Sequence, residues 1–372
     1  MTELEDKTER LAKLARESDM AGILLTTQTN FTWLTGGGIN RIDGSREPGA
    51  GSLMVTATGR RFVIANTIEM PRLLAEELDE DGGWEPVEYP WTEEHAHPET
   101  VARLAQRAAG GDRIGADWPV AGAVPIDRPI TRARNLLTPA EVGRYRRLGA
   151  DAGRIAGEVC RGLEPGEDER TIAARAAAAI ATVGARAIVT LVAADDRIAR
   201  FRHPVAGSHR WERLVMVVLC AQRDGLVVSL SRIISAGRVP AALEKLTLAN
   251  ANVFGRLLEA TEPGATGRTL FDVAQRAYAE AGYPGEEARH HQGGATGYRT
   301  REWVAHPASE EHVQARQAFA WNPSITGTKV EETALLDDRG LQLITTSPEW
   351  PSYPVRVRDQ TMAVPAVLEM GR

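Results

Sequence analysis

The stretch EPGEDERTIAARAAAAIATVG, residues 164–184, recurs in altered form as EPGATGRTLFDVAQRAYAEAGY, residues 262–283. Each copy starts with Glu-Pro-Gly, passes through a short polar loop into a helical pattern, and reaches a glycine at or near its end. Proline and glycine interrupt the preceding segment, and glycine is common just after a helix. An internal repeat of this kind predicts a domain built from two related halves.

A long helix is predicted before each copy of the repeat. In NLLTPAEVGRYRRLGADAGRIAGEVCRG, residues 135–162, Thr138 can cap a helix that has Pro139 at its first position and Glu141 at its third. The other long helix is predicted from about Pro240 to Ala260.

Between these helices, RLVMVVLCAQRDGLVVSLSRIISAG, residues 213–237, is typical of two apolar strands. Arg223, Asp224 and Gly225 would form the turn that joins them. Strands and helices therefore alternate, which indicates an α/β fold.

The N-terminal part has the pattern of a smaller α/β domain. We expect a helix to about residue 20, and then strands, a hairpin and a helix in the segments 21–27, 51–67, 68–78, 84–91 and 112–120. The predicted domains are residues 1–133, 134–358 and a C-terminal tail of residues 359–372.

The composition excludes several classes of protein. Of 372 residues, 43% are apolar and 25% charged, which is ordinary for a soluble globular protein. A net charge of -6 argues against a nucleic-acid partner. Cys160 and Cys220 lie too far apart for a CxxC motif, so a reducing cytoplasm is expected. No signal peptide or membrane-spanning run is evident.

This layout resembles the creatinase, prolidase and methionine-aminopeptidase family. The resemblance rests on LLTPAEVGRYRRLG (residues 136–149), on the repeated Glu-Pro-Gly helices, and on WNPSITGTKVEETALLDDRGLQLITTSPEWP (residues 321–351). It implies a pseudo-symmetric α/β catalytic domain of the "pita-bread" fold, preceded by a small creatinase-like domain.

Metal-dependent members of that family hold two divalent ions with two aspartates, one histidine and two glutamates. In this sequence the resemblance sets Ser229 at the second aspartate and Val218 or Cys220 at the first. It sets His291 at the histidine, and Asn322 and Glu331 at the glutamates. The loss of all but one carboxylate implies no metal and no other cofactor, with a single ion on His290, His291 and Glu331 left open.

Creatinase is a metal-free member, and resemblance to it implies that His203 is a general base. Glu331 would orient this base or bind a cationic nitrogen, or else would only pair with Lys329 or a nearby arginine. His291 would act as a second acid or as a hydrogen-bond donor. Ser231 stands in place of a hairpin glutamate of creatinase, and Tyr298 stands where metal-dependent members place a second histidine.

The loop NFTWLTGGGINRIDGSREPG, residues 30–49, is predicted to reach the pocket of a partner subunit in a homodimer. Arg41 and Arg46 could grip a substrate carboxylate there, beside Trp33. The alternative is a solvated loop with a core tryptophan.

These points predict a metal-independent creatinase-like hydrolase or lyase that acts on a C–N bond of a small polar substrate. A dimetal Xaa-Pro peptidase and an inactive pocket-bearing binding protein are the alternatives. His203, His291 and Glu331 are the predicted catalytic residues. The predicted substrate-binding residues are Tyr298, Asn322, Ser229, Ser231, Cys220, Trp33, Arg41 and Arg46.

Overall fold

The computed structural model describes residues 1–371 and divides the chain into two compact units, which meet in sequence at Ala140 and Glu141. This boundary lies beyond the predicted residue 133, because α6 (Asp127–Asn135) packs on α1 (Glu3–Glu17). Arg10 of α1 fastens the end of α6 by donating from Nη1 to the Leu136 carbonyl at 2.5 Å. The linking helix α6 therefore belongs to the N-terminal unit.

The N-terminal unit is built on a six-stranded sheet in the order β4-β3-β2-β1-β5-β6. The predicted first strand, hairpin and edge strand are confirmed. The strands are β1 (Gly22–Thr27), β2 (Pro48–Thr56), β3 (Arg61–Asn66), β4 (Trp84–Tyr89), β5 (Ile114–Ala116) and β6 (Val124–Pro125). The remaining helices are α2 (Gln28–Thr35), α3 (Met70–Arg72), η1 (Leu73–Glu77), η2 (Glu80–Gly82), α4 (Trp91–Ala96) and α5 (Thr100–Ala109).

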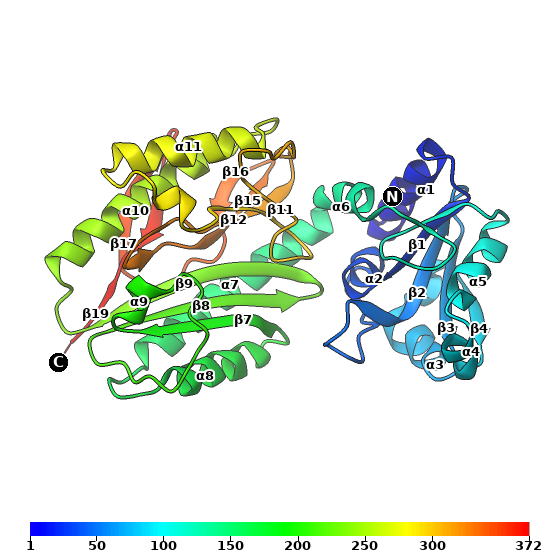
Figure 1. Ribbon diagram of the computed structural model, residues 1–372, viewed down its shortest axis with the longest axis horizontal. Helices are drawn as coiled ribbons and strands as arrows, with labels where there is room; N and C mark the ends of the chain where they lie inside the picture. The colour runs from blue at the N-terminus through cyan, green and yellow to red at the C-terminus, as the bar shows by residue number, and fades with distance from the viewer. Residues whose placement is uncertain (372) are drawn as a thin grey trace. The chain divides into compact units, whose positions relative to one another are not determined.

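The C-terminal unit contains the two related halves that the repeat predicts. In one half, α7 (Pro139–Arg161) and α8 (Glu169–Ala181) accompany the sheet β19-β9-β8-β7. In the other, α10 (Ala241–Ala260) and α11 (Gly267–Glu280) accompany the sheet β11-β10-β12-β15-β16. Figure 1 shows α8 along β7 on one side of this unit and α10 with α11 on the opposite side.

The bounds of these strands agree with the predicted hairpin at residues 213–237. The first sheet holds β7 (Arg186–Ala194), β8 (Leu214–Arg223), β9 (Leu226–Ala236) and β19 (Leu368–Met370). The second holds β10 (Gly293–Thr296), β11 (Trp303–Val304), β12 (Gln317–Trp321), β15 (Glu332–Asp337) and β16 (Gly340–Leu343). The smaller elements are α9 (Arg197–Arg200), η3 (Glu286–Ala288), β13 (Ser324–Ile325), β14 (Thr328–Lys329), β17 (Ser352–Val357) and β18 (Gln360–Pro365).

The C-terminal segment is part of the fold rather than a tail. β18 pairs with β17 through a tight turn, and β19 pairs in parallel with β9 of the first sheet. This pairing covers the edge of β9, whose backbone groups would otherwise be left open to other chains. The hairpin of β17 and β18 thus crosses residue 358, at which the prediction divides the chain.

Close packing fixes the segment that follows β16 against α7. A Cβ atom added at Gly149 would come within 2.4 Å of the Ile344 carbonyl oxygen, and one at Gly153 within 2.4 Å of the Thr346 oxygen. Glycine at these helix positions therefore lets α7 lie directly on the backbone of residues 344–346. The same helix stabilises the sheet that carries the site described below.

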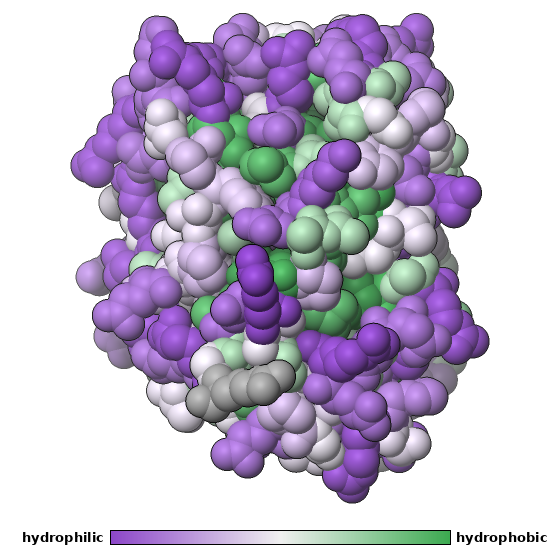
Figure 2. Space-filling view, turned by 90° about the vertical axis from the view of Figure 1, so that its left-hand side faces the viewer, coloured by the Kyte–Doolittle hydropathy of each residue, from purple (hydrophilic) through white to green (hydrophobic). Residues whose placement is uncertain are grey.

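Within residues 1–371, none of the helices combines the length and the apolar character needed to cross a membrane. Figure 2 shows one face, which is dominated by hydrophilic residues with hydrophobic residues visible in its middle.

Candidate functional site

One pocket of the C-terminal unit brings together all three predicted catalytic residues. Its volume is about 130 Å³, far below that of a typical drug-sized site. It is lined by Val189, Leu191, His203, Val218, Cys220, His291, Thr300, Arg301, Asn322, Lys329 and Glu331. Residues that lie far apart in the sequence thus meet around one small pocket.

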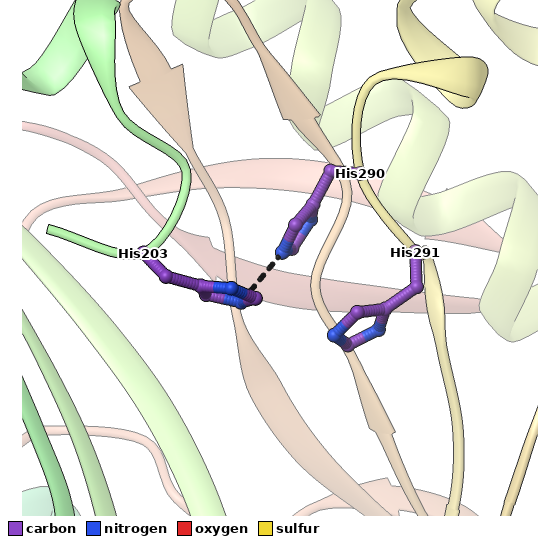
Figure 3. Close-up of side chains that lie close together, drawn as sticks. All are labelled: His203, His290 and His291. Carbon is purple, nitrogen blue, oxygen red and sulfur yellow. Dashed lines mark hydrogen bonds between the residues drawn. The ribbon is translucent and has the colours of Figure 1, made fainter.

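Three histidines converge at one side of this pocket. His203 lies between α9 and β8, whereas His290 and His291 lie between η3 and β10. The Nε2 atoms of His203 and His290 are 3.1 Å apart, and one ring nitrogen from each of the three lies within 4.8 Å of the others. Figure 3 shows His290 and His291 approaching His203 from the other side of the gap. His203 keeps an exposed edge, while His290 is buried.

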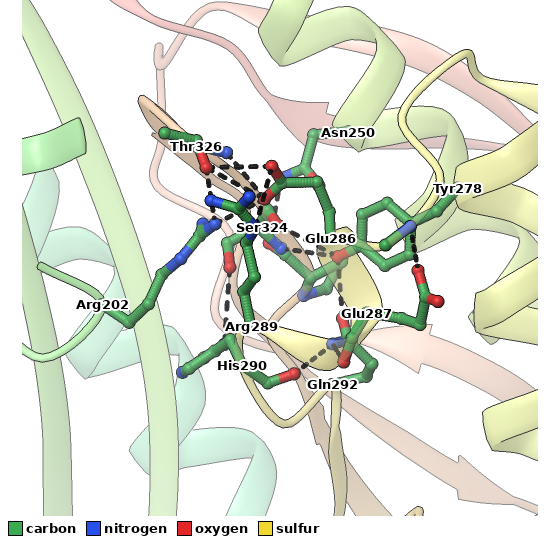
Figure 4. A network of polar contacts seen from close by, with 12 residues as sticks. Arg202, Asn250, Tyr278, Glu286, Glu287, Arg289, His290, Gln292, Ser324 and Thr326 are labelled. Carbon is green, nitrogen blue, oxygen red and sulfur yellow. Dashed lines mark hydrogen bonds and ion pairs between the residues drawn. The ribbon is translucent and has the colours of Figure 1, made fainter. Parts of the chain in front are cut away.

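A polar network behind His290 holds these segments together (Figure 4). Arg202, next to His203, forms an ion pair with Glu286 and donates to the Thr326 hydroxyl at 2.9 Å. This pairing ties the loop before β8 to η3 and to the β13–β14 turn. It explains how His203 is held beside two histidines nearly ninety positions further along the chain.

The other end of the network fixes His290 itself. The Gln292 side-chain amide donates to the His290 carbonyl, and the Tyr278 hydroxyl donates to Gln292 Oε1 at 2.7 Å. The Ser324 hydroxyl lies 3.4 Å from His290 Nδ1. Side chains from α11 and β13 therefore set the position of the imidazole.

The surroundings favour the neutral form of all three imidazoles. Burial, with the charge of Lys329 second in importance, holds the pKa of His203 and of His290 below its usual range. Burial together with Arg301 lowers the pKa of His291 to about 4. At neutral pH each ring therefore has a lone pair that can accept a proton or a hydrogen bond.

Acidification is expected to destabilise the protein as the pH falls from 6.5 toward 4. Below pH 6.5 the unfolded chain binds protons at these histidines that the folded His290 and His291 do not bind. The free energy of unfolding therefore has its full value above pH 6.5 and decreases as the pH falls below it. Thermal unfolding at a series of pH values measures the slope. His290→Gln should flatten it, and an unchanged slope in that variant would contradict this assignment.

Glu331 lines the pocket and forms the ion pairs that the sequence left open as an alternative, one with Lys329 and one with an arginine. Its Oε1 is 3.2 Å from Arg301 Nη2, and its Oε2 is 3.3 Å from Lys329 Nζ. Burial alone would raise the pKa of this carboxyl, but Lys329 and Arg301 hold it below its usual range. The carboxylate is thus charged and already offset by two cations.

Several polar atoms around the pocket lack a protein partner in the part of the chain that the structure describes. They include His291 Nδ1, Arg301 Nε and Asn322 Oδ1, and Glu331 Oε2 has only its ion pair with Lys329. Buried polar groups are normally hydrogen-bonded, so a ligand or water is the expected partner for such atoms. The backbone of Asn322 is fixed, because its N–H donates to the Gln292 carbonyl at 3.0 Å.

The hairpin residues form the floor next to the pocket. Cys220 and Ser229 face each other across β8 and β9, and the serine hydroxyl donates to Cys220 Sγ at 3.2 Å. Burial raises the pKa of the Cys220 thiol to about 11, so it is not a ready nucleophile. Ser231 is buried two positions further along β9, opposite Val218, and is not among the residues that line the pocket. Its backbone N–H donates to the Glu331 carbonyl at 3.0 Å.

Tyr298 and Trp33 do not occupy the positions that their predicted role requires. The Tyr298 hydroxyl donates to Glu141 Oε1 at 2.7 Å, so the ring faces α7 rather than the pocket. Trp33 is fully buried in the N-terminal unit, beneath Lys7, and is a core residue. Arg41 is half-buried and Arg46 exposed. Their contact with a partner's pocket stays a prediction, as does the homodimer.

The sequence did not identify Arg301 as a residue of the pocket. It identified Lys329 only as a possible ion-pair partner of Glu331. Arg301 lies in the turn between β10 and β11, which Glu302 shapes by accepting the Tyr298 backbone N–H at 2.8 Å. No spacing rule distinguishes Arg301 from its neighbour Arg299. Only the geometry of this turn decides which of them lines the pocket.

The five family positions do not fit a pair of divalent ions. Whether Val218 or Cys220 takes the first position, Glu331 is the single carboxylate of the set, and two protein cations already pair with it. The other positions are Ser229, His291 and Asn322. Two dications need several anionic oxygen ligands to offset their charge. The donor set therefore argues against a dimetal centre.

The three histidines offer the donor type that one zinc-like ion prefers, but their surroundings do not complete such a site. A ligating imidazole normally donates its second ring N–H to an acceptor, whereas His291 Nδ1 has no partner among residues 1–371. Lys329 and Arg301 also leave the pocket with an excess of positive charge, which opposes a dication. This set does not fit a resident metal either.

Comparison with known proteins supports a common origin over most of the chain. Residues 144–358 match the family model described as metallopeptidase family M24, and residues 7–123 match the one described as the creatinase/prolidase N-terminal domain. A curated Xaa-Pro dipeptidase from Pyrococcus furiosus is 25% identical over 230 residues, which are 59% of this chain and 66% of that protein. The matched part thus spans just under two thirds of this relative's length.

Solved structures share the fold of the whole chain. A dipeptidase from Mycobacterium ulcerans has a TM-score of 0.77 and 19% identity, covering 93% of this chain and 96% of that one. A prolidase from Pyrococcus horikoshii has a TM-score of 0.75 and 18% identity, covering 92% and 98%. At these identities the likeness extends to the fold alone.

Proposed function

We propose a function for this chain from the premise that it belongs to metallopeptidase family M24. The chain would hydrolyse a C–N bond of a small polar compound in the pocket that holds His203, His291 and Glu331. Names of the relatives, such as Xaa-Pro dipeptidase, support the type of bond. The pocket offers one carboxylate, Glu331, which two protein cations already pair with, and this supports a reaction that does not depend on a pair of metal ions. The convergence of His203 and His291 on Glu331 and its two cations is the observation that carries this proposal.

His203 would act as the general base. A neutral imidazole can take a proton from a water molecule that attacks the carbonyl carbon, and then return it to the leaving nitrogen. His290, 3.1 Å away, orients the ring and can share its proton. His291, whose ring centre lies 5.8 Å from that of His203, would donate a hydrogen bond to the substrate.

Glu331 would act mainly as a fixed charge in this scheme. Its carboxylate keeps Arg301 and Lys329 in position, at 3.2 and 3.3 Å. Lys329 in turn helps to keep His203 neutral. The chemistry therefore depends on a balanced set of charges rather than on one residue.

A dimetal Xaa-Pro peptidase is the second candidate, because the named relatives favour it. One assay separates the two. Xaa-Pro dipeptides and N-acyl amino acids are incubated with the purified protein, either after chelation or with added Mn²⁺. Turnover that survives chelation and disappears in His203→Asn supports our proposal, and turnover that requires the metal supports the second candidate.

The rate is expected to fall on the acidic side of pH 6.5, where His203 begins to take up a proton. Because the pKa of this group is lowered, kcat/KM should stay constant from neutral pH down to a value below 6.5. Lys329→Gln removes a charge that lowers this pKa, so it should move the acidic limb toward higher pH. A pH profile of both proteins measures the shift. Superimposed limbs would mean that His203 is not the titrating base.

A further inference from the structure

We propose that Ser324, acting through His290, fixes the tautomer of His203, so that this ring holds its own hydrogen on Nε2 and takes up the proton of the attacking water at Nδ1. Ser324 is thus a positioning residue for the reaction. The inference rests on the proposed function, because it specifies how the general base of that reaction is prepared. It adds the atom that takes the proton and the residue that makes this atom available.

The contact between His203 and His290 has room for only one hydrogen. Their Nε2 atoms are 3.1 Å apart, and both rings are neutral at pH 8 because the pKa of each lies below its usual value. A neutral imidazole has one N–H and one lone pair, so one ring donates and the other accepts. If His203 donates, its Nδ1 has a free lone pair and His290 carries its hydrogen on Nδ1. If His290 donates, both Nδ1 atoms are reversed.

The pocket favours the arrangement in which His203 donates. His203 lines the pocket together with Lys329 and Arg301, whereas His290 does not. His203 Nε2 is therefore occupied by a residue outside the pocket lining, and Nδ1 is the ring nitrogen left for a water or substrate. Glu331 offsets only one of the two cations. The remaining positive charge attracts a lone pair and repels an N–H, so Nδ1 should be unprotonated.

Ser324, the first residue of β13, is placed to accept the hydrogen of His290. In the favoured arrangement His290 Nδ1 carries a hydrogen in the interior, where a donor without an acceptor is costly. Its hydrogen-bond partner among residues 1–371 is the Ser324 hydroxyl, 3.4 Å away (Figure 4). Tyr278 fixes Ser324 there, because its hydroxyl accepts the Ser324 backbone N–H at 2.8 Å. Ser324 is 2% exposed and lies outside the pocket lining, so it would act on His203 through His290.

This chain of contacts should become stronger as the reaction proceeds. When Nδ1 takes a proton from water, His203 becomes a cation and donates more strongly from Nε2 to His290. The polarised His290 then donates more strongly from Nδ1 to Ser324. Catalytic hydrogen bonds are often long before substrate binds and tighten in the transition state, which agrees with the distance of 3.4 Å. An interaction that strengthens only in the transition state affects kcat rather than KM.

Nitrogen NMR of the protein with isotope-labelled histidine reads the tautomers directly, at pH 8 and without substrate. Protonated and unprotonated ring nitrogens differ widely in chemical shift. His203→Asn and His290→Gln assign the signals of these two among the eight histidines. We expect the hydrogen of His203 on Nε2 and that of His290 on Nδ1. The reverse assignment, with His203 protonated on Nδ1 and His290 on Nε2, would overturn the inference.

Ser324→Ala removes the acceptor and keeps the backbone bond to Tyr278. The tautomers should shift toward the reverse arrangement, because a buried N–H without an acceptor is costlier than an unused lone pair. We expect kcat to fall about two- to tenfold, the usual effect of losing one neutral hydrogen bond, with KM unchanged. Ser324→Thr keeps the hydroxyl and should retain both properties. Ser309→Ala, at a buried serine in the loop between β11 and β12, is the matched control and should behave like the wild type.

The outcomes separate this inference from the proposed function. Wild-type tautomers or a wild-type kcat in Ser324→Ala would overturn the role of Ser324. An equal loss of kcat in Ser324→Thr and Ser324→Ala would also overturn it, because the side chain would then act through packing rather than through its hydroxyl. Absence of any His203-dependent hydrolysis would reject the proposed function, whereas the tautomers are measured without substrate and do not depend on it.

Discussion

His203→Asn is expected to lower the rate of hydrolysis about 10²- to 10⁴-fold, the usual contribution of a positioned acid–base group. Asparagine can still hydrogen-bond to His290, which lies 3.1 Å from the native ring, but it cannot accept a proton at neutral pH. The loss should therefore appear in kcat rather than in KM. Steady-state kinetics on the best substrate of the panel measures both values.

The fold should survive this change because His203 is partly exposed and lies outside the strands. His209→Asn, in the same loop before β8 and also exposed, is the matched control and should keep the wild-type rate. If His203→Asn lowers kcat by less than about threefold, another group is the base, since a positioned base contributes far more to the rate than that.

Arg232→Met is expected to destabilise the protein by about 3–5 kcal/mol at neutral or higher pH. Arg232 and Glu332 are both essentially unexposed, and their charged atoms are 2.7 Å apart. Burial outweighs this pairing and raises the pKa of the Glu332 carboxyl to about 7. Without the arginine, the ionised Glu332 carboxylate would still accept a hydrogen bond from the Thr345 hydroxyl, but it would lose its ion pair.

The loss of stability in Arg232→Met should depend on pH, because protonation of Glu332 removes the unpaired buried charge. Denaturant unfolding of wild type and Arg232→Met should differ most at pH 8 and least at pH 5, on either side of a pKa of about 7. Arg154→Met, which breaks an exposed pair with Glu158 at 3.0 Å, serves as control and should cost at most about 1 kcal/mol. Equal costs for both substitutions would mean that the buried pair does not stabilise the fold.

The sequence allowed the architecture to be predicted because its signals are local or repeated. The repeated Glu-Pro-Gly helices indicated two halves, and the resemblance to the creatinase and prolidase family is confirmed by the family match and the solved structures. The C-terminal strands escaped prediction because β19 is only three residues long and is stabilised by pairing with β9. Such distant pairing leaves little trace in local patterns.

The sequence pointed to the histidines and to Glu331 of the candidate site, but not to the two cations that line the same pocket. His203 and His291 came from motif positions, and the structure brings both to one pocket. Arg301 came from no motif, since a turn between β10 and β11 selects it over Arg299. Tyr298 occupies a motif position, yet its hydrogen bond to Glu141 directs it elsewhere. Motif spacing identifies residues, whereas turn geometry decides which of them share a space.

The most direct test of the central claim, that this pocket works without the metal pair of its family, is the metal content of an active preparation. Elemental analysis should be performed on the same purified sample whose turnover is measured, before and after dialysis against a chelator. Our account predicts far less than one divalent ion per chain and unchanged turnover after chelation. A pair of ions per chain, with turnover lost on chelation and restored by adding the metal back, would contradict it.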